Sequence, residues 1–213
     1  MSRNWLRGWF ADITGTFNLL RRSLDHPLVE QLYPGDYLQR LLQVQDESEM
    51  FFKSLDLLPQ TFCHMDAFRR NLFASKSPGG DDKTVAIDWA FTGQGAVGEE
   101  LAPLVAANLL FFEVDTSDAH ELDQAVFQSY LEGLADAGWH GDPRMARLGY
   151  AAAVTLRYTA PIMLHHLIDE KMHAGLEQFF GCSIKQMIDR WSEVTRFQLD
   201  LADEARQLLN IVR

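Results

Sequence analysis

The sequence predicts a mainly helical α+β domain that carries one small β hairpin. Three observations predict this fold class. Two short apolar segments flank the turn-forming residues Pro78, Gly79 and Gly80, as expected for a hairpin. The sequence after Gly98 has the pattern of successive helices. The N-terminal segment has apolar residues at helical spacing: Trp5, Trp9, Ile13 and Phe17.

The predicted elements follow in order from the N-terminus. Residues 4–24 form an amphipathic helix that ends at the Asp25-His26-Pro27 segment. A second helix runs from about Tyr37 to Leu55. The segments Asn71–Ser77 and Thr84–Trp89 are then the two strands of the hairpin.

The remainder is predicted to be helical. One helix covers 98–112, and another covers 118–138 with Asp118 and Glu121 placed as a capping box. The order of Asp142 and Pro143 is typical of an N-cap and a first helical residue.

That helix should continue through Arg157 and be interrupted at Pro161. Ser183 and Gln186 form a second capping-box pattern before the last helix. The whole chain, 1–213, is predicted to be a single domain with a helical lead-in (1–60), a central segment (61–97) and a helical subdomain (98–213).

Composition indicates a globular protein that works in a reducing compartment. Thirty acidic residues against nineteen basic ones give a formal charge of −11, which argues against binding nucleic acid through its phosphates. The longest apolar run, 101–112, is too short to cross a bilayer, so no membrane partner is expected. The N-terminus lacks the apolar core of a signal peptide, and the two cysteines are far apart in sequence. A cytoplasmic location is therefore predicted.

The negative charge is concentrated in one part of the chain. The segment from Thr84 to Pro143 contains no Lys or Arg and eleven acidic residues. It could be a solvated surface that aids solubility, or a surface that attracts metal ions or cationic substrates. Both interpretations remain open from the sequence.

Three residues of the central segment carry the chemistry needed for phosphoryl transfer. Such a reaction requires a carboxylate that orients or deprotonates the attacking hydroxyl, and oxygen ligands that hold Mg²⁺ against the nucleotide phosphates. Asp66, Asn71 and Asp88 supply these groups, and the hairpin is expected to bring Asp88 back beside Asn71.

These residues stand in HMDAFRRN (64–71) and VAIDWAF (85–91), which resemble two motifs of the aminoglycoside phosphotransferase and choline kinase family. In that family, which has a protein-kinase-like fold, the loop reads H-G-D-x-x-x-x-N and the metal aspartate lies in I-D-W/F. The resemblance covers the large C-terminal lobe from about Leu38 onward. Met65 replaces the usual glycine, and Phe68 replaces a residue that is commonly polar.

The resemblance implies a role for each residue. Asp66 would be the catalytic base, Asn71 and Asp88 would bind Mg²⁺ together with ATP or another nucleoside triphosphate, and His64 would hold the loop. Without the resemblance, His64 could be a core histidine, Asp66 and Asn71 turn formers, and Asp88 a helix cap.

The resemblance also suggests where the acceptor binds. Family members that act on aminoglycosides or amino alcohols bind cationic substrates with carboxylates from large-lobe helices. The corresponding candidates by position are Glu113, Asp115, Asp118 and Glu121. The expected partners are a nucleotide and a small-molecule hydroxyl substrate, with a cationic group as one option.

The glycine-rich strand and strand lysine of a kinase-like small lobe are not visible before His64. The sequence could be a fragment, the small lobe could be a separate chain, or nucleotide clamping could have been lost. A solitary large lobe would expose an apolar cleft face, which Trp5, Trp9 and Phe10 could cover, although packing in the core is the commoner role of such a stripe.

Two function classes follow. The first is an ATP- and Mg²⁺-dependent small-molecule O-phosphotransferase, represented by its large lobe. The alternative is a catalytically inactive helical interaction module that kept the fold without the reaction. A third interpretation, a coincidental motif, predicts that Asp66, Asn71 and Asp88 lie far apart.

Overall fold

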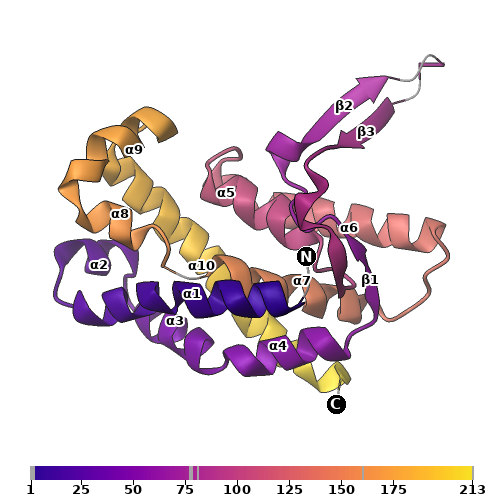
Figure 1. The fold of residues 1–213 in the computed structure, drawn as a ribbon, viewed down its shortest axis with the longest axis horizontal. Coiled ribbons are helices and arrows are strands. Elements are labelled where there is room, and N and C mark those ends of the chain that lie inside the picture. Colours follow the sequence, from indigo (N-terminus) through magenta and orange to yellow (C-terminus); the bar gives the residue numbers. More distant parts are fainter. Residues whose placement is uncertain (1–2, 77–78, 81, 160, 213) are drawn as a thin grey trace.

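Helices make up most of the chain in the computed structural model, which describes residues 3–76, 79–80, 82–159 and 161–212 (Figure 1). The helices are α1 (Arg3–Arg22), α2 (Pro27–Leu32), α3 (Tyr37–Asp46), α4 (Ser48–Leu57), α5 (Asn108–Leu110), α6 (Ala119–Asp136), α7 (Pro143–Tyr158), α8 (Leu164–Ile168), α9 (His173–Phe180) and α10 (Ile184–Leu208). The strands are β1 (Gln60–Cys63), β2 (Leu72–Lys76), β3 (Asp82–Ala86) and β4 (Gly93–Ala96). The predicted mainly helical α+β class is confirmed.

The N-terminal part differs from the prediction in one place. Helix α1 forms as expected, with Ile13 and Phe17 buried. The single helix predicted from Tyr37 to Leu55 is wrong, because the chain forms α3 and α4 with a break at Glu47 (φ −94°, ψ 2°). The break lets α3 and α4 bury separate apolar faces.

Two of the three predicted helix caps are confirmed. The Asp142 side chain accepts a hydrogen bond from the Arg144 N–H at the start of α7. Ser183 and Gln186 form a reciprocal capping box at α10. The capping box predicted at Asp118 is wrong, because Asp118 makes no side-chain cap of α6.

The segment predicted as one helix over 98–112 begins later and contains wider turns. Residues 97–100 form a turn, and the helical run starts at Leu101. The part from Pro103 to Ala107 is π-helical and continues directly into α5. Such a widened segment within a helix is frequently found beside functional sites.

In the sequence, α4 is followed by four strands that form two separate two-stranded antiparallel sheets, and the helical run from Leu101 comes after them. Strands β2 and β3 form a hairpin at the predicted place, in register from Leu72 opposite Ala86 to Lys76 opposite Asp82, and the hairpin projects away from the helices (Figure 1). The predicted end of its second strand at Trp89 is wrong, because β3 ends at Ala86 and Trp89 begins a 3₁₀ turn. Ser77, Pro78 and Asp81 of its turn lie outside the described residues. The second sheet, which pairs β1 with β4, was not predicted.

Helix α7 packs against the backbone that follows β4. A Cβ atom on Gly149 would lie 2.0 Å from the Val97 carbonyl oxygen, and one on Gly98 would lie 1.9 Å from the Ala146 carbonyl oxygen. Gly98 also has a left-handed backbone (φ 87°). Glycine at both positions allows this approach, which holds α7 close to the strands.

Two hydrophobic cores share the long helix α10. The first includes residues of α1, α4 and α7, and the second includes residues of α2, α3 and α8. Val194 and Leu201 of α10 belong to the first core, while Trp191 and Leu199 belong to the second. None of the described helices combines the length and apolar character needed to cross a membrane.

Candidate active site

The hairpin and β1 bring the motif residues to one place. Strand β1 ends at Cys63 and leads directly into His64 and Asp66. Asn71 immediately precedes β2, and the Ile87 N–H donates to the Asn71 carbonyl oxygen over 3.0 Å, which extends the hairpin by one residue pair. Asp88 therefore follows at the end of the hairpin where Asn71 lies.

His64 is buried and uses both ring nitrogens to hold the loop. Its Nδ1 accepts a hydrogen bond from the Asp66 N–H at 3.3 Å. In the neutral ring the proton is then on Nε2, which donates to the Ile87 carbonyl oxygen at 2.8 Å. The ring also lies 4.6 Å from the Trp89 ring. These contacts favour a structural role for His64 over proton exchange.

The Asp66 carboxylate is held from two sides. Asn71 Nδ2 donates to the Asp66 carbonyl oxygen at 2.9 Å and to Asp66 Oδ2 at 3.0 Å. Arg157 Nη2, from the last turn of α7, donates to Asp66 Oδ1 at 3.1 Å. The amide nitrogen of Asn71 is used on Asp66, and no hydrogen bond to its Oδ1 is found among the described residues, so this oxygen can act as an acceptor or metal ligand.

Asp88 presents its carboxylate to solvent. The residue is exposed and has a left-handed backbone (φ 58°) directly before the 3₁₀ turn Trp89–Phe91. It makes no side-chain cap of that turn, and no hydrogen bond or ion pair of its carboxylate is found among the described residues. The geometry therefore does not support a capping role for Asp88.

The pair formed by Asn71 and Asp88 fits a metal that arrives with phosphates. Magnesium usually takes one or two carboxylates from protein and completes its octahedron with water and phosphate oxygens. In the described part of the chain, no group of three or more His, Cys, Asp or Glu side chains could hold a metal ion. One amide oxygen and one carboxylate are the kinds of protein ligand that Mg²⁺ takes alongside nucleotide phosphates.

The Glu100 carboxylate holds the loop through the backbone of Met65. The sequence motifs did not point to this residue. Met65 has a left-handed backbone (φ 66°), and its N–H donates to Glu100 Oε2 at 3.2 Å. Burial raises the pKa of Glu100, and hydrogen bonds from the Met65 and His64 N–H groups and from Cys63 partly offset this. The acidic pair Glu99–Glu100, which lies in the turn just after β4, could have signalled such a role.

The contacts of the four predicted acceptor-binding acids differ. Glu113 binds two arginines of the loop, Arg69 at 2.7 Å and Arg70 at 2.9 Å. Asp115 accepts hydrogen bonds from Ser117, whose hydroxyl also donates to Asp118. Glu121 is exposed in the first turn of α6. The structure thus places Glu113 against the loop and the other three around the start of α6.

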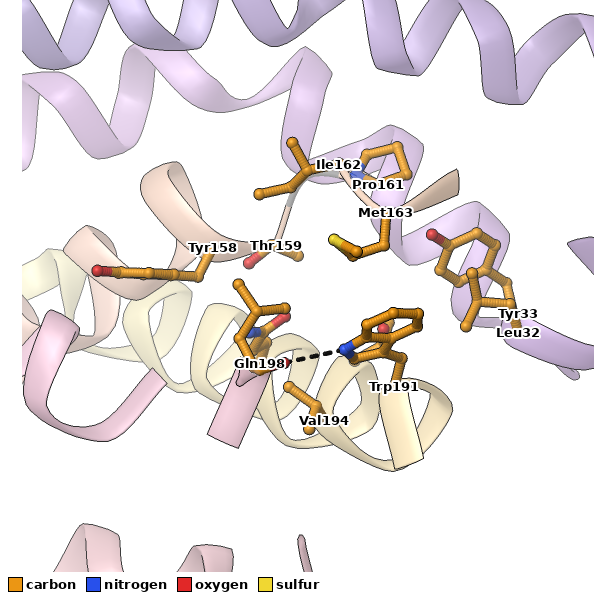
Figure 2. Close-up of a pocket in the computed structure, with 12 residues that line it drawn as sticks. Leu32, Tyr33, Tyr158, Thr159, Pro161, Ile162, Met163, Trp191, Val194 and Gln198 are labelled. Carbon is orange, nitrogen blue, oxygen red and sulfur yellow. Dashed lines mark hydrogen bonds between the residues drawn. The ribbon is translucent and has the colours of Figure 1, made fainter. Parts of the chain in front are cut away.

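A small cavity lies at the break after α7, between that break, α2 and α10 (Figure 2). Its volume is about 30 Å³, which is enough for one water molecule. Tyr158 and Gln198 line it, and the Trp191 Nε1–H beside it donates to the Leu110 carbonyl oxygen at 3.0 Å. None of the predicted site residues line the cavity.

A comparison with protein families finds a match over most of the chain. The model of the phosphotransferase enzyme family (APH) matches residues 9–161, more than two thirds of the 213-residue chain. This range includes both motifs and Arg157. Among curated proteins and among solved structures, no match to the chain is found.

Proposed function

The chain belongs to the phosphotransferase enzyme family, and from this premise we propose that it transfers the terminal phosphoryl group of a Mg²⁺-bound nucleoside triphosphate, ATP in the first instance, to a hydroxyl of a small molecule. The observation that carries the proposal is the hydrogen-bonded cluster of Asp66, Asn71 and His64 at the end of the hairpin that Asp88 follows. Asn71 and Asp88 would hold the Mg²⁺ that accompanies the nucleotide, and the ion would supply positive charge that offsets the charge developing on the phosphoryl group during transfer.

Each residue has a part that follows from its contacts. Asp66 has two carboxylate oxygens in fixed positions, each with a lone pair left to accept the acceptor's hydroxyl proton. Asn71 Oδ1 and the exposed Asp88 carboxylate would hold the metal. His64 keeps the two motifs together through Ile87.

The exposed apolar face of the hairpin supports binding of a planar base. Phe73 and Val85 are opposite each other across β2 and β3, so their side chains lie on one face. Ile87 lies on that same face, two residues beyond Val85. All three are exposed by 45–50% although they are apolar, and they lie on the hairpin that leads to Asp88.

For the acceptor we propose a small hydroxyl compound, with a cationic group as one option. Arg69 and Arg70 neutralise Glu113, which leaves Asp115, Asp118 and Glu121 as the more accessible carboxylates for a cation. A substrate panel in which only neutral or anionic alcohols are phosphorylated would remove the cationic option.

A transfer assay tests the proposal. The full chain is mixed with Mg²⁺–ATP and a panel of sugars, amino alcohols and aminoglycosides, and release of ADP is measured. Replacing Asp66 with Asn should lower the rate by about 10²–10⁴-fold, because the base is lost while the side-chain shape is kept. Asp46→Asn, at an exposed aspartate on α3, is the matched control and should keep full activity. An Asp66→Asn variant as active as the wild type would refute the base assignment.

The second candidate function is an inactive interaction module. One observation favours it: residues 3–59 of the described chain form α1 to α4 and include no strand that could clamp a nucleotide from above. Calorimetry with Mg²⁺–ATP separates the two candidates. Binding that is lost in Asp88→Asn supports the phosphotransferase, whereas no binding to the wild-type chain supports the module.

A further inference from the structure

Arg157 contacts the candidate catalytic loop at two adjacent points. One amino group, Nη1, donates to the Met65 carbonyl oxygen, and the other, Nη2, donates to Asp66 Oδ1 at 3.1 Å. The two side chains are mostly shielded from solvent, with 16% of Arg157 and 19% of Asp66 exposed. The planar guanidinium group therefore binds both the backbone carbonyl of Met65 and the carboxylate of Asp66.

Aromatic rings from two helices fix the guanidinium group. Its central carbon lies 5.5 Å from the ring centre of Trp5 and 5.2 Å from that of Tyr158. Trp5 belongs to α1 and also contacts Phe91 edge-on, with the ring centres 5.6 Å apart. The first helix thus reaches the candidate site through Trp5, while the rest of its apolar stripe packs in the core.

Asn71 completes the arrangement around Asp66. Its amide nitrogen holds Oδ2, while Arg157 holds Oδ1, so the carboxylate cannot rotate without breaking one of the two contacts. An ionised carboxylate has about four lone-pair positions, and these donors use two of them. The remaining positions keep a defined direction in which a hydroxyl group can be received.

We infer that Arg157 is a positioning residue of the transfer reaction, which holds the Asp66 carboxylate in the orientation that accepts the proton of the acceptor hydroxyl. This inference rests on the proposed function. Arg157 acts through Asp66 and need not touch either substrate. Its place at the end of α7, next to the C-terminal end of the helix dipole, also suits a cation.

Kinetic parameters of Arg157 variants test the role. Arg157→Met should lower kcat by about 10–100-fold while the KM for Mg²⁺–ATP changes by less than about twofold, because orientation is lost and nucleotide contacts are kept. The kcat of Arg157→Lys should lie between those of the wild type and Arg157→Met, since one ammonium group cannot bind Met65 O and Asp66 Oδ1 in the same planar geometry. Arg144→Met, which changes an exposed arginine in the first turn of α7, is the matched control.

Guanidinium ions supplied at millimolar concentration provide a readout that a purely structural role would not give. They should restore part of kcat in Arg157→Ala and leave Asp66→Asn unchanged. An unchanged kcat in Arg157→Met overturns the inference. So does a loss of kcat that tracks a lower melting temperature in every Arg157 variant, Lys included, without rescue.

Thermal unfolding separates failure of the contact from failure of the proposed function. The decreases in melting temperature caused by Arg157→Met and Asp66→Asn should not add up in the double variant. The double variant should melt no lower than the less stable of the two single variants. Additive losses would overturn the inference whatever the activity. A wild-type chain that transfers no phosphate despite non-additive losses would instead refute the proposed function and leave Arg157 as a structural partner of Asp66.

Discussion

Met65 occupies a backbone conformation that usually belongs to glycine, and the surrounding residues explain how a methionine is accommodated. Its φ of 66° costs roughly 1–3 kcal/mol for a residue with a side chain. The N–H group and the carbonyl oxygen of Met65 are bound by Glu100 and Arg157 respectively. Its buried side chain fills the space above Gly95, where an added Cβ would lie 2.1 Å from Met65 Cε.

This complementarity predicts that the two positions are coupled. Gly95→Ala should destabilise the wild-type protein, because the new methyl group displaces the Met65 side chain. The same change should cost less in a Met65→Gly background, where that space is empty. A double-mutant cycle by urea unfolding should show a coupling energy of about 1 kcal/mol or more. Equal costs of Gly95→Ala in the two backgrounds would show that the contact is not tight.

Glu100 predicts a specific pH dependence of stability. Because burial raises its pKa in the folded state, the folded protein binds this proton more tightly than the unfolded chain does. The contribution of Glu100 to the free energy of unfolding is therefore most favourable below its ordinary pKa of 4.5. This contribution falls as the pH rises from 4.5 toward the raised pKa. Glu100→Gln removes this titration while keeping an acceptor for the Met65 N–H.

The free energy of unfolding of Glu100→Gln relative to wild type should thus increase as the pH rises above 4.5. Urea unfolding at several pH values measures this difference. Gln124→Ala, which replaces an exposed neutral residue on α6, serves as control and should give a constant difference. A constant difference for Glu100→Gln as well would contradict the raised pKa.

At the scale of elements, Arg147 joins three helices through buried charge. Its guanidinium group donates to Asp123 of α6 at 2.7 Å and to Glu204 of α10 at 2.7 Å. Only 17% of the Arg147 side chain and 9% of the Asp123 side chain are exposed. Burial by itself lowers the pKa of Arg147, but the hydrogen bonds and charges of Glu204 and Asp123 outweigh it and raise the pKa, so Arg147 stays charged at every accessible pH.

Arg147→Met should therefore destabilise the protein by about 3–5 kcal/mol, because it leaves Asp123 buried without its cation. The double change Arg147→Met with Asp123→Leu should recover part of this loss. Chemical denaturation provides both values. A loss below about 1 kcal/mol would mean that water reaches Asp123, in which case the network does not hold α6 against α7.

The elements that could be predicted are those whose own residues signal them. The stripe of α1, the Asp142 and Ser183 caps and the hairpin all depend on local spacing. Strand β4 (Gly93–Ala96) gave no such signal, because its sequence GQGA lacks the β-branched and aromatic residues of typical strands. Its glycine at 95 is required by Met65, which is distant in sequence.

The same distinction applies to the candidate site. His64, Asp66, Asn71 and Asp88 could be found because their spacing along the chain is itself a motif. Arg157 could not, because it lies 91 residues after Asp66 and is one of nineteen basic residues with no distinguishing neighbours. The sequence also does not indicate that Glu113 pairs with Arg69 and Arg70. This pairing changes how the acidic segment from Thr84 to Pro143 is interpreted. Several of its acids bind arginines or are buried.

At the scale of the whole molecule, α10 makes the two hydrophobic cores depend on each other. Its buried residues contribute to both cores in turn along the helix. Neither core can unfold without removing support from α10. The β2–β3 hairpin, by contrast, belongs to neither core, and its Phe73 and Val85 side chains are exposed. The site therefore combines a loop anchored by helices with a hairpin whose stability is local.

This arrangement predicts cooperative unfolding even when only the second core is damaged. Leu41 is fully buried in that core, so Leu41→Ala should cost about 2–5 kcal/mol and lower the melting temperature by roughly 5–15 °C. Far-ultraviolet circular dichroism, which reports all helices, and the fluorescence of Trp191, isolated by replacing the other tryptophans with Phe, should give one coincident transition. Phe73→Ala, on the exposed hairpin, should leave the melting temperature nearly unchanged. If the Trp191 transition came first, the second core would be a separate folding unit, and Asp66 with its partners, which attach to the first core through α7, would remain assembled above that temperature.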